Sequence, residues 1–154
     1  MASKRLGPVS SSVTKAAGEE KYLGGFSSAT MRREVAAGYG IYATNRRFFG
    51  IYDRLASPGP LLARRPSGHQ LMKLLAKSGE KALISELERR RDLEVKREDI
   101  STVEIRKPGL LRKGRIMIRD VSGRRADLWI LEDRDFEQAK NLLQKFRPDA
   151  LIVT

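Results

Sequence analysis

The feature that most constrains the fold is an apolar stripe near the C-terminus of the chain. Its members recur at intervals of three and four residues, which places them along one face of an α-helix. They are Phe136, Ala139, Leu142, Leu143 and Phe146. Asp133 precedes the stripe as a candidate N-cap, and Pro148 follows it where a helix stops. Because such a helix is not stable alone in water, it must pack its stripe against another layer.

Segments with the character of β-strands precede this helix. Residues 39–44 and 46–52 are rich in β-branched and aromatic side chains. Asn45 lies where they meet, and Asn tolerates the left-handed conformation of tight turns, so a hairpin is expected here. Residues 22–27 predict an earlier strand, weakened by two glycines, with a loop at residues 31–33. Further strands are expected at residues 100–106, 115–119 and 126–131.

Residues 58–92, between the hairpin and the later strands, predict a loop followed by a helical insertion. Ser67 and Gln70 have the spacing of a capping box. Residues 86–99 mix charges of both signs and predict a solvated helix that neutralises itself. The insertion is expected either to cover Trp129 or to leave it at an interface. An apolar face continues through Leu83, Ile84 and Leu87.

The length of 154 residues predicts a single domain. Residues 1–18 are rich in Ser, Ala and Gly without a periodic apolar face, which predicts a disordered N-terminal tail. The domain is then expected over residues 19–147, with residues 148–154 as a C-terminal extension.

Two segments resemble the pleckstrin-homology-like superfold, especially the bacterial PH and GRAM-type families. Residues 40–51, GIYATNRRFFGI, are similar to the y-x-T-N-x-R strand–turn–strand of those families. Residues 99–105, followed by the Ile116/Ile118 strand, the glycines around it and the final helix, resemble their second half. The resemblance implies an α+β fold. It would be a PH-like antiparallel β-barrel or sandwich of about six to seven strands, capped by a C-terminal helix, with a helical insertion.

The chain is strongly basic, with 31 Lys and Arg against 19 Asp and Glu, for a formal charge of +12. A protein with this net charge attracts nucleic acid, anionic membranes and acidic proteins in a salt-dependent way. Residues 106–119 contain six cations and no acid, which predicts a positive stripe on a hairpin. The stripe is either a surface for an anionic partner or only a solvent-exposed face. The candidate binding residues are Arg32, Arg33, Lys107, Arg112, Lys113, Arg115, Arg119, Arg124 and Arg125.

No set of residues typical of catalysis or metal binding is visible. The chain has no Cys, and its single histidine, His69, has no second metal ligand of its kind. The Gly38-x-Gly40 pair lacks the remaining residues of a phosphate loop and predicts a close approach of strands instead. Asp133 and Asp135 fall in a first helical turn, where the helix dipole favours negative charge. The sequence therefore predicts a protein that is not an enzyme and holds no cofactor or metal.

The function expected is that of a non-catalytic PH-like adaptor that recognises a protein partner or an anionic membrane surface. The alternative is a nucleic-acid-binding domain that uses phosphate contacts. Pairing of sheet edges into homo-oligomers stays open. No apolar run approaches the roughly 20 residues of a membrane helix, and no secretory signal is apparent, so a cytoplasmic protein is expected.

Overall fold

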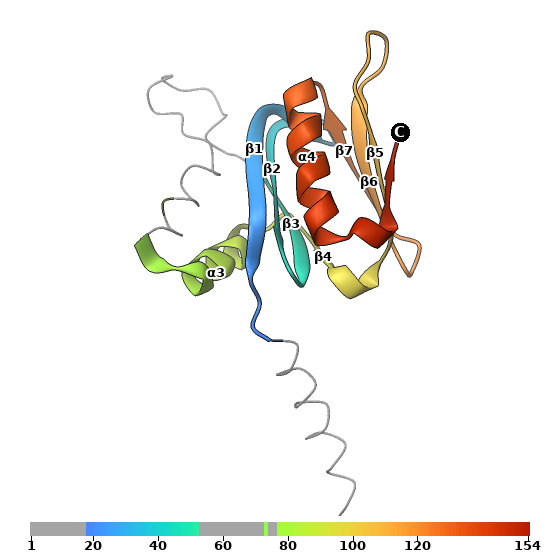
Figure 1. Ribbon diagram of the computed structural model, residues 1–154. Helices are drawn as coiled ribbons and strands as arrows, with labels where there is room; N and C mark the ends of the chain where they lie inside the picture. The colour runs from blue at the N-terminus through green and yellow to red at the C-terminus, as the bar shows by residue number, and fades with distance from the viewer. Residues whose placement is uncertain (1–17, 53–72, 74–76) are drawn as a thin grey trace, which may run out of the picture.

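The computed structural model describes residues 18–52, 73 and 77–154 of the chain (Figure 1). The tail expected over residues 1–18 lies outside the described residues apart from Gly18. The capping residues expected at Ser67 and Gln70 lie outside them too.

The described residues form one eight-stranded sheet with two α-helices. The strands are β1 (Tyr22–Arg33), β2 (Ala36–Thr44), β3 (Arg47–Tyr52), β4 (Leu93–Lys96), β5 (Ile100–Arg106), β6 (Gly114–Asp120), β7 (Arg125–Ile130) and β8 (Leu151–Val153). The helices are α3 (Glu80–Arg90) and α4 (Asp133–Phe146), with short 3₁₀ turns η4 (Arg97–Asp99) and η5 (Pro148–Ala150). The strand order is β4-β3-β2-β1-β7-β6-β5-β8.

The sheet has two halves that join at β1. Strands β1 to β4 form one antiparallel meander, and β5 to β7 form another. The register between β1 and β7 consists of the single pair Arg32 and Trp129. The pairing of β1 with β2 shifts between Ser28 and Arg32, and such irregularities bend a strand. The two halves therefore lie on either side of α4, as Figure 1 shows.

Helix α4 closes the main core, as its apolar stripe predicts. Leu143 and Phe146 are each 1% exposed, and the ring centroids of Phe146 and Phe48 lie 6.0 Å apart. The helix contacts strands of both halves of the sheet, including β1, β2, β5 and β7. Its N-cap is Glu132 rather than Asp133, which is already helical. The prediction of a helix packed against a sheet is confirmed.

Helix α3 covers the opposite face of the first half of the sheet. Leu83 and Leu87, both fully buried, pack with Phe49 and neighbouring side chains of β2 and β3. Tyr42 belongs to the same cluster, and its ring lies against Gly25, where a Cβ atom would come within 2.2 Å of it. Gly25, one of the two glycines that weakened the predicted strand at residues 22–27, therefore makes room for a core tyrosine.

The hairpin predicted from residues 39–52 is confirmed, but its turn works differently. Among the described residues other than glycine, only Glu34 has a positive φ, so Asn45 is not left-handed. Instead, Asn45 Oδ1 accepts a hydrogen bond from the Lys21 N–H at 2.8 Å. The Thr44 hydroxyl accepts the N–H groups of Arg46 and Arg47 at 3.1 and 2.9 Å. Side-chain oxygens therefore satisfy backbone groups around this turn.

Two local predictions are wrong. The loop expected at residues 31–33 belongs to β1, and the turn follows at Glu34 and Val35. The helix expected over residues 86–99 ends at Arg90, and the chain continues into β4. Leu93 and Val95 alternate there and pack against the main core, so burial overrides the charge pattern.

The pleckstrin-homology-like architecture is also wrong for this chain. Its six to seven antiparallel strands in a barrel or sandwich are replaced by one eight-stranded mixed sheet with two helices in the described residues. The difference arises partly from residues 148–154, expected as an extension, where β8 runs parallel to β5 and pairs Leu151 with Val103. An isolated apolar triplet carries no signal of the strand it will join.

Candidate anion-binding surface on the β5–β6 hairpin

Strands β5 and β6 form an antiparallel hairpin, with one register shift between Ile100 and Thr102, that positions most of the predicted cations. Their register pairs Val103 with Ile118 and Arg106 with Arg115. Alternation along β6 turns Ile116 and Ile118 into the core, as expected, and directs Arg115 away from it. The cations of the strand therefore lie on the face opposite α4.

A row of residues crosses this outer face over four strands. Arg32 on β1 pairs with Trp129 on β7, Trp129 pairs with Arg115 on β6, and Arg115 pairs with Arg106 on β5. Adjacent strands lie about 4.8 Å apart, so the row is continuous. Trp129 is half-buried, and the Lys113 ammonium lies 6.0 Å from the centroid of its ring.

The hairpin cations have no acidic partner among the described residues. None of the ion pairs there involves any of the six cations of residues 106–119. Their contacts are of other kinds: the Arg106 guanidinium donates to the Lys113 carbonyl at 3.1 and 3.3 Å, and Arg119 donates to the Met117 sulfur at 3.8 Å. The six cations are Arg106, Lys107, Arg112, Lys113, Arg115 and Arg119.

Two leucines at the tip of the hairpin were not singled out by the sequence reasoning. Leu110 and Leu111 are 102% and 100% exposed, and they lie between Lys107 and Arg112. Two adjacent apolar residues inside a glycine-flanked, acid-free segment are the signal that identifies them. The hairpin therefore ends in an apolar tip with a basic collar.

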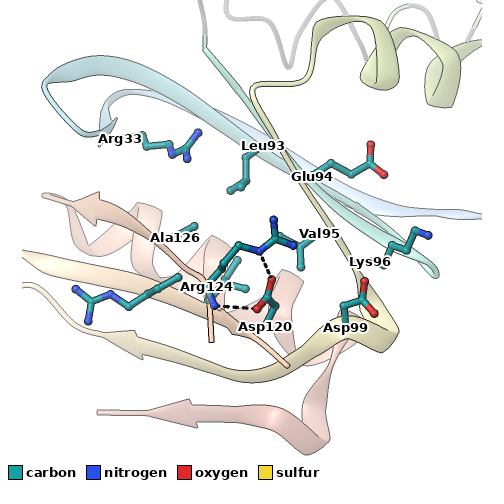
Figure 2. A pocket seen from close by; sticks show the side chains of 11 residues that line it. Arg33, Leu93, Glu94, Val95, Lys96, Asp99, Asp120, Arg124 and Ala126 are labelled. Carbon is teal, nitrogen blue, oxygen red and sulfur yellow. Dashed lines mark hydrogen bonds and ion pairs between the residues drawn. The ribbon is translucent and has the colours of Figure 1, made fainter. Parts of the chain in front are cut away.

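A second basic region lines a cleft of about 400 Å³ between β4 and the β6–β7 turn (Figure 2). Its arginines are paired with carboxylates. Arg124 Nε lies 3.1 Å from Asp120 Oδ2, and Arg33 forms an ion pair with Asp92. Glu94 also lines the cleft, so its charge is largely self-compensated.

The pKa shifts in this region follow from the same pairing. Hydrogen bonds from the Ser122 hydroxyl and from backbone N–H groups outweigh desolvation and hold the pKa of Asp120 below its ordinary value. Burial disfavours the charged form of Arg33, but contacts with Asp92 outweigh it and raise the pKa of Arg33. These cations are occupied by internal partners.

The nine predicted binding residues therefore fall into two groups. One group comprises the cations on or beside the β5–β6 hairpin, with no ion pair among the described residues: Arg32, Lys107, Arg112, Lys113, Arg115 and Arg119. The other comprises those paired with an aspartate: Arg33, Arg124 and Arg125. Arg32 joins the first group only because β1 pairs with β7 at Trp129. Sequence alone could not bring it beside Arg115.

Acidic residues of α4 have a structural role. Asp135 is 1% exposed, and its carboxylate accepts hydrogen bonds from Ser28 at 2.6 Å and Thr30 at 3.3 Å. Asp135 and Glu132, which also binds Thr30, tie the start of α4 to β1. In the described ranges, no three His, Asp or Glu side chains group as metal ligands, and His69 lies outside these ranges.

Comparisons with known proteins add no family. No protein-family model and no curated protein matches this sequence. No helix in the described part of the chain combines the length and the apolarity needed to cross a bilayer.

Proposed function

We propose that this chain is a non-catalytic binding domain that recognises an anionic surface through the β5–β6 hairpin. One observation supports it above the others: residues 106–119 carry six cations, and no ion pair within the described residues involves them. The six positive charges repel one another in the free protein, and binding of a polyanionic ligand removes that repulsion. Anionic membranes and acidic proteins both have this chemistry.

The test uses the full-length protein and vesicles with and without phosphatidylserine. The variant Arg112→Glu/Lys113→Glu reverses two hairpin charges, and each cation near an anionic membrane is worth about 1 kcal/mol. We therefore expect binding to phosphatidylserine vesicles to fall by at least about tenfold. Trp129, the one tryptophan of the chain, lies beside Lys113 and provides the fluorescence signal.

The matched control is Arg89→Glu/Arg91→Glu, which changes the net charge by the same amount. Arg89 and Arg91 are exposed and pair with Glu86 and Glu94. We expect this variant to bind nearly as the parent does. Equal losses in both variants would mean that net charge alone acts, and absence of binding by the parent would reject an anionic membrane as the ligand.

A nucleic-acid ligand is the second candidate, and the row across the outer face favours it. A sheet face with an aromatic side chain among cations can stack a base and contact phosphates. Here Trp129 lies between Arg32 and Arg115. Tight binding of single-stranded RNA that weakens steeply between about 50 and 200 mM salt, and that Trp129→Leu reduces, would promote this candidate. Stronger binding to vesicles than to RNA under the same conditions would reject it.

A further inference from the structure

The β5–β6 hairpin is an arm with an apolar end. Figure 1 shows it projecting beyond the rest of the sheet and past α4. At its tip, Leu110 and Leu111 retain essentially all of their side-chain exposure, so neither packs against the protein. Leu131, at 39% exposed, lines a shallow concavity with them. Two adjacent, fully exposed leucines at the most prominent point of a surface do not stabilise the fold, and exposed apolar residues of this kind indicate an interaction site.

The tip is held in shape by backbone contacts. The Gly109 N–H donates a hydrogen bond to the Arg112 carbonyl at 2.9 Å, which leaves the two leucines as the central residues of the turn. Pro108 fixes its own backbone and lies against Gly114, where a Cβ atom would come within 2.8 Å of the proline ring. The leucines are therefore presented without a large ordering cost on binding.

Basic residues surround the two leucines on both sides. The segment from residue 106 to residue 113 reads RKPGLLRK, with two cations before the tip and two after it. We propose that this tip inserts Leu110 and Leu111 into the outer layer of an anionic lipid bilayer, while the four flanking cations contact lipid headgroups. This inference rests on the proposed function and names the anionic surface as a membrane.

A bilayer fits both parts of the tip. Its headgroup layer supplies negative charge for the cations, and the hydrocarbon beneath it accepts leucine side chains. A fluid apolar layer needs no complementary pocket, whereas a protein partner would need one for a convex tip. Phosphates of nucleic acid would pair with the cations but leave the leucines in water, so an RNA ligand does not account for them.

The geometry also sets which part of the protein stays out of the membrane. Strand β6 has seven residues and spans about 20 Å between its two turns. Val121, 69% exposed, lies in the turn at the far end. If the Leu110–Leu111 tip is inserted, Val121 must remain in water, which makes it a control site of similar chemistry at the other end of β6.

The experiment places an environment-sensitive fluorophore at either end of the hairpin. The chain contains no cysteine, so full-length Leu110→Cys and Val121→Cys variants can each carry one label. With phosphatidylserine-containing vesicles, we expect a blue-shifted emission and quenching by spin-labelled lipid for the label at position 110 and neither for the label at 121. Equal responses at both positions, or none at 110 while the protein is bound, would overturn insertion.

A second variant separates insertion from charge. Leu110→Ser/Leu111→Ser should keep the melting temperature, because neither side chain packs against the protein. It should weaken vesicle binding by about tenfold or more, since burial of one leucine alone favours transfer by that order. The binding that remains should be more salt-sensitive.

The outcomes distinguish the two proposals. Parent-like binding by the serine variant, with a loss in Arg112→Glu/Lys113→Glu, would reject insertion and leave the anionic-surface function standing. Parent-like binding by both variants would reject both. A tenfold loss in RNA binding by the serine variant, with no vesicle binding by the parent, would reject a membrane and assign the tip to nucleic acid.

Discussion

Two stretches of equal length, residues 86–99 and 106–119, use positive charge in opposite ways. The first has five cations and six acids, and the second has six cations and no acid. In the first, Glu86 pairs with both Arg89 and Arg90, and Arg91 pairs with Glu94. In the second, no ion pair forms within the described residues. The acids interleaved in the first stretch decide the difference.

The surroundings of a cation, not its presence, indicate its role. Arg47 forms ion pairs with Glu88 and Glu94 of the first stretch and with Glu20. Its side chain is only 17% exposed. Its hydrogen bond with Glu20 and the neighbouring carboxylates raise the pKa of Arg47, although burial opposes this. Cations paired with carboxylates, such as Arg47, stabilise the fold, whereas the hairpin cations remain available to a ligand.

The largest effect is expected from Leu143→Asp, which tests whether the domain that carries both stretches depends on α4 for its fold. Leu143 is 1% exposed in the main core. Replacing it with a charged residue removes apolar burial and places a carboxylate in the core, at a cost of at least about 4 kcal/mol. We expect loss of cooperative thermal unfolding by circular dichroism. An unchanged melting temperature would show that the helix is not part of the core.

A smaller effect separates the two uses of positive charge. Arg47→Met leaves Glu20 and its neighbours without their cation, and we expect the free energy of unfolding to fall by about 2 kcal/mol. Arg112→Met, on the exposed hairpin, should change it by no more than about 0.5 kcal/mol. Denaturant melts of the two variants provide the measurement. Equal losses would contradict the division of roles.

The smallest effect is expected on the pH dependence of stability in acid. Burial opposes ionisation of Glu20, but hydrogen bonds from Arg47 and Thr44 outweigh it and hold the pKa of Glu20 below its ordinary value of 4.5. A lowered folded-state pKa adds stability that is complete above 4.5 and is lost as the pH falls below it. In Arg47→Met, we expect the melting temperature to depend less steeply on pH in that window. An identical slope in parent and variant would show that the pair does not contribute.

Much of the fold was predictable where pattern and burial agree. The stripe of α4, the strands at residues 100–106, 115–119 and 126–131, and the hairpin at residues 39–52 follow from periodicity. β4 and β8 did not follow, because Leu93–Lys96 and Leu151–Val153 are short, and pairing with β3 and β5 makes them strands. The predicted barrel or sandwich failed for that reason: strand number and order depend on contacts remote in sequence.

The charge of residues 106–119 follows from the amino-acid sequence alone, since a stretch without acids cannot neutralise itself locally. The apolar stripe of α4 likewise requires that this helix pack against another layer. The tertiary structure sets which cations are paired, because partners such as Asp92 for Arg33 come from distant segments. It likewise decided that Leu110 and Leu111 stand bare at the tip, because exposure depends on which parts of the fold reach a turn, and a local pattern does not contain that information.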